Sequence, residues 1–322
     1  MKQLLLFALL ALSTALSTAA VAQGYPARPM RLIVADAAGG APDQLGRIVA
    51  QKLSDSMGQP MIVDNRPGAA GVLGADLASK APADGYTLLL TTTSIYALLP
   101  SMKKNLPYDP VKDFVAISRI ATASNVLVVN AALPVNSVAE LIALAKGKPG
   151  VYNYASAGIG SPAHLAGEML NLLAGIRITH VPYKGAAPGL LDVIAGNPHL
   201  IITSPISAAG HMNAGRVRAL ATTGAQRNPR LPDLPTIADT VPGYEISQTW
   251  GLAAPTGTPS AIVTRLSDET GKAIRLTDVK ERVLGMGAVP AGDTPAQFQA
   301  YIDRERRRLG DVIARTGIVL AD

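Results

Sequence analysis

The chain of 322 residues contains no cysteine. Disulfide bonds and the attachment of a lipid to a cysteine are therefore excluded. Beyond the N-terminus, no segment approaches the run of about 20 apolar residues that is needed to span a bilayer. Aromatic residues make up only 4% of the chain, whereas 48% of it is hydrophobic. A chain of this length buries cores large enough to fold without disulfides, so the composition indicates a globular protein.

Signals for catalysis and for metal or cofactor binding are also sparse. The histidines are isolated from one another and lie at His164, His180, His199 and His211. No HExxH motif occurs, Gly68–Gly74 lacks the lysine of a phosphate-binding loop, and no histidine has the spacing of a catalytic triad. Tyr154–Gly158 nearly matches the nucleophile elbow of hydrolases but lacks its first glycine. We therefore expect no catalytic residue, metal or cofactor, and a secreted serine hydrolase is the least favoured alternative.

The N-terminus has the three parts of a secretory signal peptide. Lys2 precedes an apolar run over residues 4–12, and the small residues Ala20–Ala22 follow. Residues 1–22 are therefore predicted to be removed by cleavage after Ala22, which would place the mature protein in the periplasm. A retained membrane anchor is the alternative, but the apolar run is too short to cross a bilayer.

The net charge gives no sign of a nucleic-acid partner. The formal value of +6 includes Lys2, so the mature chain keeps +5. Basic and acidic residues are interleaved, and the one dense run, Arg304–Arg308, is predicted to be a solvated helix face. No added DNA-reading helix pair is indicated, and secretion separates the protein from DNA. The charge would at most raise the encounter rate with small anions.

Predicted strands and helices alternate along the chain, which is typical of α/β proteins. Strands are expected at 30–34, 61–63, 86–90, 115–120, 126–129, 151–154, 178–181, 199–203, 217–222 and 246–254. Helices are expected at 42–57, 71–80, 137–146, 162–173, 186–195 and 205–213, with two more in the C-terminal part. The pattern predicts a mostly parallel sheet with helices on both faces, and it restarts near residue 126.

Two glycine-rich turns stand where a predicted strand gives way to a predicted helix. The first, Gly39–Asp43, contains Gly39, Gly40 and Asp43, and the second, Ser156–Pro162, contains Ser156, Gly158, Gly160 and Ser161. A proline stands near the first helical position in both. Such a turn offers unpaired backbone N–H groups and about half a positive charge from the helix dipole. Two facing turns can hold a small anion without an arginine.

A turn in each half of the chain predicts two α/β lobes with a ligand cleft between them. Ligands of open α/β sheets bind at the carboxyl ends of strands, where both turns fall. We expect the first lobe to comprise residues 23–125 and the second residues 126–224. Residues 225–322, after the boundary loop 224–235, would return through the hinge and complete the first lobe. A hinge between the lobes would close on a bound solute.

Three of the candidate site residues have a structural alternative. Asp43 either interacts favourably with the dipole of its helix, or it fixes the glycine turn or accepts a hydrogen bond from the solute. Ser161 either caps its helix or contacts the ligand. The Ser94 hydroxyl, which follows the strand at 86–90, either meets the solute or caps the next helix.

A series of motifs in one order resembles the Bug family, the periplasmic solute-binding receptors associated with tripartite tricarboxylate transporters. The motifs are Met30–Val34 with Gly39, Gly40 and Asp43, then Asp64–Gly68, Ala83–Leu88, Asn105–Pro110, Asn153–Ser156, His180–Gly185 and Leu252–Pro255. The resemblance extends from about Tyr25 to the C-terminus. It implies a type II periplasmic binding fold and a carboxylated solute that is held largely by main-chain amides and bridging waters, without catalysis.

The chain departs from the family pattern at positions close to the predicted ligand. Ala35 and Asp36 replace an apolar Pro-Phe pair, His199 and Thr203 stand where aspartates are frequent, and Ser204 replaces an asparagine. An aspartate beside an anion-binding turn repels a carboxylate unless it pairs with a ligand cation or faces away. We expect Ser94, Thr203 and Ser204 to select the part of the solute that the turns do not hold.

The sequence therefore predicts a monomeric receptor that binds a small carboxylated solute and passes it to the membrane subunits of a tripartite tricarboxylate transporter. The alternative is a sensor that presents the closed form to a membrane receptor. The sequence does not distinguish these two partners, because both would recognise the closed form.

Overall fold

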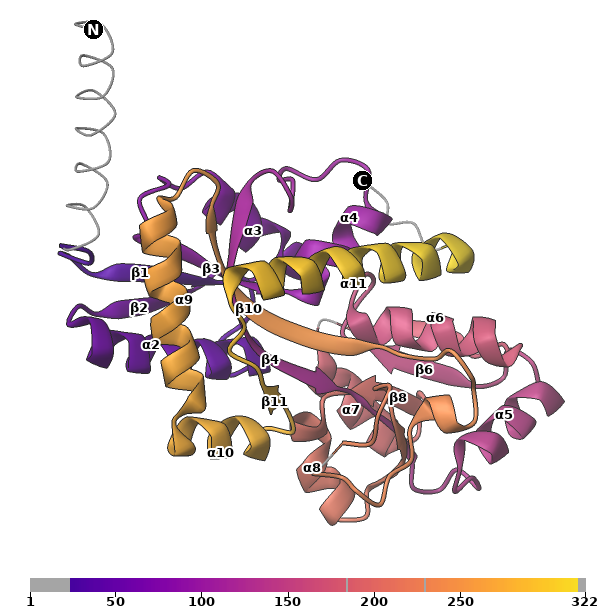
Figure 1. The fold of residues 1–322 in the computed structure, drawn as a ribbon. Helices are drawn as coiled ribbons and strands as arrows, with labels where there is room; N and C mark the ends of the chain where they lie inside the picture. Colours follow the sequence, from indigo (N-terminus) through magenta and orange to yellow (C-terminus); the bar gives the residue numbers. More distant parts are fainter. Residues whose placement is uncertain (1–23, 184, 229, 318–322) are drawn as a thin grey trace, which may run out of the picture.

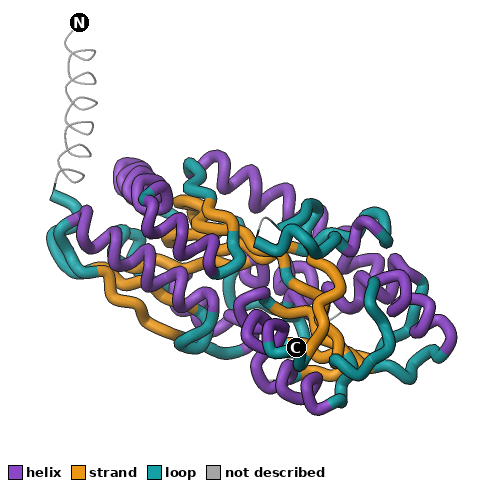
Figure 2. The backbone as a smooth tube through the Cα atoms, turned by 90° about the horizontal axis from the view of Figure 1, so that it is seen from below, coloured by secondary structure: helices purple, strands orange, loops and turns teal. Residues whose placement is uncertain are grey.

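The computed structural model describes residues 24–183, 185–228 and 230–317. The predicted signal peptide, residues 1–22, and its cleavage after Ala22 lie outside these residues. Within the described ranges, no helix combines the length and the apolar character that a membrane span requires. The strands form two separate sheets with helices packed around them (Figures 1 and 2).

The first sheet contains six strands in the order β11-β4-β10-β3-β1-β2. These are β1 (Met30–Val34), β2 (Met61–Asn65), β3 (Thr87–Thr92), β4 (Phe114–Ser124), β10 (Ser247–Pro255) and β11 (Val289–Pro290). β1 pairs in parallel with β2 and β3. β10 runs antiparallel between β3 and β4, and β11 is antiparallel to β4. The sheet therefore combines an early and a late part of the chain.

The second sheet contains five strands in the order β7-β6-β8-β5-β9. These are β5 (Val126–Asn130), β6 (Asn153–Ser156), β7 (Thr179–Pro182), β8 (Leu200–Thr203) and β9 (Val217–Thr222). β6 is parallel to β7 and β8, whereas β5 runs antiparallel between β8 and β9. All of its strands come from one continuous part of the chain.

The expectation of a mostly parallel sheet is wrong, because both sheets are mixed. β4 leads into β5 through the single residue Asn125, and β9 leads into β10 through residues 223–246. β4 ends at the carboxyl edge of the first sheet, so β5 starts at the adjoining carboxyl edge of the second sheet. β10 likewise starts at the carboxyl edge of the first sheet after β9 has ended at that of the second. Each of these two strands therefore runs against its parallel neighbours, since no crossover helix has carried the chain back to the other edge.

The helices follow the expected alternation in the first 220 residues and differ from it at two places. They are α2 (Ala41–Met57), α3 (Val72–Ser79), α4 (Leu99–Met102), α5 (Val138–Gly147), α6 (Pro162–Ala174), α7 (Ala186–Ala195), α8 (Pro205–Asn213), α9 (Ser260–Arg275), α10 (Thr277–Gly285) and α11 (Pro295–Thr316). Short helical turns are η1 (Ala69–Gly71), η2 (Ser94–Leu98) and η3 (Ile237–Asp239). Three C-terminal helices form where two were expected, because Leu276 has an extended backbone (ψ 138°) between α9 and α10. The helical segment of η2 and α4 was not predicted.

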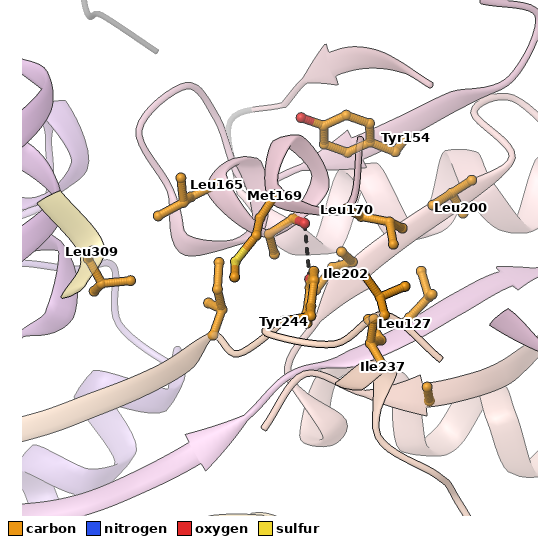
Figure 3. Packing of buried hydrophobic residues seen from close by; sticks show 14 of the residues in the cluster. Leu127, Tyr154, Leu165, Met169, Leu170, Leu200, Ile202, Ile237, Tyr244 and Leu309 are labelled. Atoms are coloured by element: carbon orange, nitrogen blue, oxygen red, sulfur yellow. Dashed lines mark hydrogen bonds between the residues drawn. The ribbon is translucent and has the colours of Figure 1, made fainter. Parts of the chain in front are cut away.

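The longest helix, α11, connects the two halves of the molecule. Thr294 and Gln297 form a capping box at its start, which satisfies two N-terminal N–H groups. The helix packs on β4, η2 and α4 of the first half and on α6 of the second (Figure 1). Leu309 of α11 belongs to the same buried cluster as Leu165 and Met169 of α6 (Figure 3). One apolar core therefore extends from the second sheet to the C-terminal helix.

Candidate functional site

The carboxyl ends of the parallel strands lie at one edge of each sheet. In the first sheet Val34 pairs with both Asn65 and Leu90, so the loops after β1, β2 and β3 emerge together. In the second sheet Ser156 pairs with Pro182, and β8 runs parallel beside β6. These edges are where ligands of α/β sheets bind.

The two carboxyl edges adjoin at a double connection. The Asn125 N–H donates to Thr223 Oγ1 at 2.8 Å, and the Thr223 N–H donates to the Asn125 carbonyl at 2.9 Å. The Ile246 N–H donates a hydrogen bond to the Thr223 carbonyl at 2.8 Å. The connections β4–β5 and β9–β10 are thus hydrogen-bonded to each other. Both predicted glycine turns emerge from the edges that meet here.

In the first turn, the N–H groups of both glycines donate hydrogen bonds to nearby residues of the same loop. Gly39 has φ +86°, a left-handed conformation that favours glycine, and its N–H donates to Asp43 Oδ2 at 2.8 Å. The Gly40 N–H points to the Ala37 carbonyl at 3.4 Å. Among the described residues no acceptor is found for the N–H groups of Ala41 and Asp43 in the first turn of α2. The donors available to an anion therefore belong to the helix start rather than to the glycines.

Asp43 holds this turn in place. Its side chain is buried, and its two oxygens accept hydrogen bonds from the Gly39 N–H, from Asn65 Nδ2 at 3.0 Å and from Arg47 Nε at 3.0 Å. Burial alone would raise the pKa of Asp43, but the bonds from Arg47, Gly39 and Asn65 outweigh it and lower the pKa below its usual value. The turn-fixing role expected for Asp43 is confirmed.

The described arginines next to the first turn, Arg47 and Arg66, are paired with carboxylates. Arg47 is paired with Asp43 at 2.9 Å, and Arg66 is paired with Asp64 at 3.0 Å. Asp36 adds a negative charge, with its Cγ 3.8 Å from the point that a β-carbon on Gly40 would occupy. Although Asp36 keeps an exposed surface, partial burial of its carboxylate raises its pKa, and the charge of Asp43 raises it further.

The second turn is built in the same way. Gly158 (φ +124°) and Gly160 (φ +81°) have left-handed backbones. Their N–H groups bond to Ser156 Oγ at 3.1 Å and to His164 Nδ1 at 3.3 Å. Ser161 Oγ accepts the His164 N–H at 3.2 Å, which confirms that Ser161 is the N-cap of α6. Within the described chain, the N–H groups of Ile159 and Ala163 have no acceptor.

A pair of stacked histidines supports this turn from behind. The rings of His164 and His180 lie 4.1 Å apart, and His180 Nε2 is 2.6 Å from Ser156 Oγ. Burial lowers the pKa of His180 to about 4, with a further contribution from His164. Burial also lowers the pKa of His164, against the opposing charge of Glu168. Both rings are therefore neutral at neutral pH.

The contact between Ser156 and His180 was not expected from the sequence, because β6 and β7 bring the two residues together only in the sheet. Ser156 is fully buried, and its hydroxyl also bonds the Gly158 backbone. In the described part of the chain no carboxylate hydrogen-bonds His180. The pair therefore supports the turn, and within the described residues it lacks the hydrogen-bonded carboxylate of a catalytic triad.

The remaining candidate residues lie at the ends of two strands, Ser94 after β3 and Thr203 and Ser204 at β8. Ser94 begins η2 and is half-buried, and the N-cap of this turn is Thr93, without a side-chain capping bond. Ser204 is the N-cap of α8 and accepts the Ser207 N–H at 3.2 Å. Thr203 ends β8 and is 3% exposed. Its hydroxyl has no hydrogen-bond partner among the described residues.

His199 is separated from Thr203 by the length of β8. Its Nδ1 accepts the Asn153 N–H at 3.1 Å, and its ring packs against Tyr152. It therefore lies at the opposite edge of the sheet from the two turns. Across the described residues no group of three or more histidines and carboxylates is arranged to hold a metal ion.

Two buried polar residues beside Val126 of β5 were missed by sequence reasoning. Asn125 (1% exposed) and Thr222 (0% exposed) have side-chain atoms without a partner in the described structure. Asn125 stands between two predicted strands and Thr222 at the end of a third. That position at strand ends is the only sequence signal for them, and it is shared by many structural residues.

Two surface hollows lie away from these residues. One, of about 470 Å³, is lined by Lys103, Tyr108 and Arg306 among others, and one of about 280 Å³ is lined by Tyr25, Asp84 and Ile262 among others. No predicted ligand residue lines either of them. We propose the candidate site at the adjoining carboxyl edges, because the helix starts with N–H groups that lack an acceptor follow strands that end there.

Comparison with known proteins gives the class and the family. The family of tripartite tricarboxylate transporter receptors matches residues 45–318. A UPF0065 protein from the tcbD-tcbE intergenic region of Pseudomonas sp. is 38% identical over 93% of this chain and 89% of its own length. Protein BugT of Bordetella pertussis is 36% identical over 93% of this chain and 92% of its own length.

Solved structures show the same architecture. Rpa4515 of R. palustris with adipate has a TM-score of 0.86 and 38% identity, over 92% of this chain and 99% of that one. Periplasmic binding protein BugD has a TM-score of 0.82 and 29% identity, over 92% and 99%. MatC of Rhodopseudomonas palustris with bound malate has a TM-score of 0.81 and 28% identity, over 90% and 100%.

The fold is thus that of the two-lobed periplasmic binding proteins. The chain belongs to the tripartite tricarboxylate transporter receptor family, which includes the Bug proteins. The resemblance read from the sequence motifs is confirmed.

Proposed function

We propose that this protein is a periplasmic receptor that captures a small carboxylated solute between its lobes and delivers it to a tripartite transporter in the membrane. The main observation behind the proposal is that backbone N–H groups at the starts of α2 and α6 have no hydrogen-bond acceptor among the described residues. Both helix starts follow strand ends at adjoining edges. Main-chain donors and helix dipoles favour an anion there, although the nearby arginines are paired.

The relatives support the class of solute. Rpa4515 is described with adipate and MatC with malate, and both are dicarboxylates. In the proposal, Gly39, Gly40 and Asp43 shape one half of the clamp, and Ser156, Gly158, Gly160 and Ser161 shape the other. Ser94, Thr203 and Ser204 contact the rest of the solute. The protein releases the solute without chemical change.

The proposal includes the arrangement of the mature chain. Cleavage after Ala22 releases a periplasmic monomer whose first lobe consists of residues 23–125 and 225–322. Residues 126–224 form the second lobe. This division is supported by the composition of the two sheets, since β5 to β9 all lie between residues 126 and 222.

A thermal-shift screen of the mature protein tests the function. The panel contains adipate, malate and mono- and tricarboxylates, together with amino acids and sugars. A ligand at about 100 times its Kd adds about 2.7 kcal/mol to the stability, so a true solute raises the Tm clearly. Mass spectrometry of small molecules released by denaturing the purified protein identifies a co-purified solute. Failure of every carboxylate to raise the Tm, or conversion of a bound one into a product, would contradict the proposal.

A further inference from the structure

One carboxylate beside the first glycine turn has no charged partner in the described part of the chain. Asp36 is the second residue after β1 and stands four positions before the N-cap of α2. Its Oδ1 accepts the N–H of the next residue, Ala37, at 2.7 Å. Among the described residues, no lysine or arginine forms an ion pair with it. A free negative charge next to a predicted anion-binding turn needs an explanation, because like charges disfavour binding.

The arginines near this turn are already paired with other carboxylates. Asp43 forms its ion pair with Arg47 at 2.9 Å. Asp64, at the end of β2, is paired with both Arg31 and Arg66. Together with the unpaired carboxylate, these residues contribute equal numbers of positive and negative charges. The first turn therefore offers no surplus positive charge to a solute that carries negative charge alone.

The side chain of Asp36 lies against the start of α2 rather than away from it. Its Cγ is 3.8 Å from the point that a β-carbon on Gly40, the N-cap of this helix, would occupy. The Asn65 side chain fixes the backbone there, since its Nδ2 donates to the Asp36 carbonyl at 3.1 Å and to Asp43 Oδ1 at 3.0 Å. A helix start with free N–H groups and a carboxylate side chain are thus held next to each other.

This arrangement distinguishes two kinds of solute. A solute with negative charge alone, bound at the start of α2, would lie beside the like charge of Asp36, and the repulsion would grow when closure excludes water. A solute with a positive group next to its carboxylate would satisfy both partners. Burial raises the pKa of Asp36, and the charge of Asp43 raises it further, so the protein itself leaves the carboxylate uncompensated.

We infer that Asp36 is a specificity-determining residue whose carboxylate pairs with a cationic group of the solute, next to the solute carboxylate that is held at the first turn. The inference rests on the proposed function and narrows its solute to carboxylates that also carry a positive charge. An ionised carboxylate accepts several hydrogen bonds, and the Ala37 N–H occupies only one of these positions on Asp36. A charge-assisted bond from an ammonium group fits the remaining ones.

Calorimetry with matched pairs of solutes tests this role of Asp36. Each pair consists of an amino acid and the same acid without its amino group: aspartate with succinate, glutamate with glutarate, and alanine with propionate. The wild-type protein is expected to bind the amino acid of at least one pair about ten- to hundredfold more tightly. Asp36→Asn keeps the oxygen that accepts the Ala37 N–H and removes the charge. It is expected to abolish the preference by weakening only the amino acid.

Asp55→Asn is the matched control, because it changes the net charge by the same amount at the other end of α2. Asp55 is exposed, and its Oδ1 accepts a hydrogen bond from Gln51 Nε2 at 2.8 Å. It lies about 18 Å along the helix from Asp43, a distance at which exposed charges are screened. This variant is expected to keep the wild-type preference. Both variants should keep the Tm of the free protein, since neither carboxylate has an ion pair within the described residues.

Three results would overturn the inference. If wild type binds carboxylates but prefers the amino acid in no pair, or if Asp36→Asn keeps the preference, the role of Asp36 is wrong while the proposed function stands. If Asp36→Asn weakens both members of a pair equally, or lowers the Tm, the residue serves the structure of the turn. If wild type binds no carboxylate at all, the proposed function fails and the inference fails with it.

Discussion

At the scale of single residues, the polar side chains of the two turns accept hydrogen bonds from backbone amides of the same turn. Asp43 bonds the Gly39 amide, and Ser156 and His164 bond the amides of Gly158 and Gly160. This internal bonding leaves a few neighbouring N–H groups in fixed positions. Fixed donors lose little entropy when they bind an anion, so the turns are organised before the solute arrives.

Gly40→Val tests the first turn without disturbing the fold. Gly40 has φ −69° and ψ 169°, which any residue adopts, and the nearest atom to a β-carbon there is the Ala37 carbonyl oxygen at 3.4 Å. The valine side chain would cover the N–H groups at the start of α2. We expect at least about tenfold weaker solute binding in calorimetry, with a stability change below about 1 kcal/mol.

Gly39→Val is the matched control for this substitution. The φ of +86° at Gly39 strains a β-branched side chain, so this variant is expected to lose about 1 to 3 kcal/mol of stability. Normal binding by Gly40→Val would show that the first turn does not hold the solute.

The buried histidines predict a pH dependence of stability. In the unfolded chain a histidine takes up a proton below a pH of about 6.5, whereas His180 in the folded protein does so only near a pH of about 4. The unfolded state therefore binds more protons between these values, and the free energy of unfolding falls as the pH falls through this window. The expected loss is on the order of 1 to 3 kcal/mol in urea unfolding.

His180→Asn separates this effect from the titration of other groups. Asparagine cannot take up the proton but keeps a polar group near Ser156. Its free energy of unfolding should depend less on pH between about 6.5 and 4 than that of the wild type. Equal slopes for the two proteins would show that His180 does not carry the effect.

At the scale of elements, the position of α11 depends on a close approach that only glycine permits. A β-carbon on Gly251 of β10 would lie 2.3 Å from the Phe298 ring of α11 and 2.9 Å from the Ser118 carbonyl oxygen. Phe298 is fully buried in the core that joins the two halves. The missing side chain at position 251 thus lets helix and sheet pack together.

Gly251→Ala is expected to reduce the free energy of unfolding by about 1 to 3 kcal/mol, because the added methyl group overpacks the core. Gly285→Ala at the end of α10 is the control, since nothing lies within 4 Å of its β-carbon position. That variant should be as stable as the wild type or slightly more stable. Equal urea unfolding curves for the two variants would contradict the packing argument.

At the scale of the whole molecule, the halves are joined by the single residue Asn125, by the longer connection over residues 223–246, and by α11. The connections bond to each other through Asn125 and Thr223, and we expect the hinge at this point. Bending there would move the two turns together or apart without breaking either sheet. The core at α11 would limit the motion to a rotation that keeps this helix packed.

Closure of the lobes is expected to make the protein more compact. A saturating carboxylate that binds in calorimetry should reduce the radius of gyration in small-angle X-ray scattering. Gly40→Val at the same carboxylate concentration should scatter like the free protein. An unchanged radius of gyration in a fully liganded wild-type sample would contradict the hinge.

Sequence reasoning predicted the local structure well where one element decides it. The ends of β1, β7 and β8 lie within one residue of the expected strands, because short apolar runs and turn residues are local signals. The N-cap role of Ser161 was one of two readings, and the structure decides it. The mixed sheets and the pairing of Ser156 with His180 were missed, because strand direction and neighbours are set by distant segments.

The sequence by itself determined the family, the alternation of strands and helices, and the two turns at helix starts, since each is encoded by residues close together in the chain. Only the tertiary structure decided which backbone N–H groups lack an acceptor, and that Thr203 and Thr222 pair with Val126 from its two neighbouring strands. The physical reason is that hydrogen bonding between distant strands consumes some polar groups and leaves others without a partner, and no local pattern records that balance.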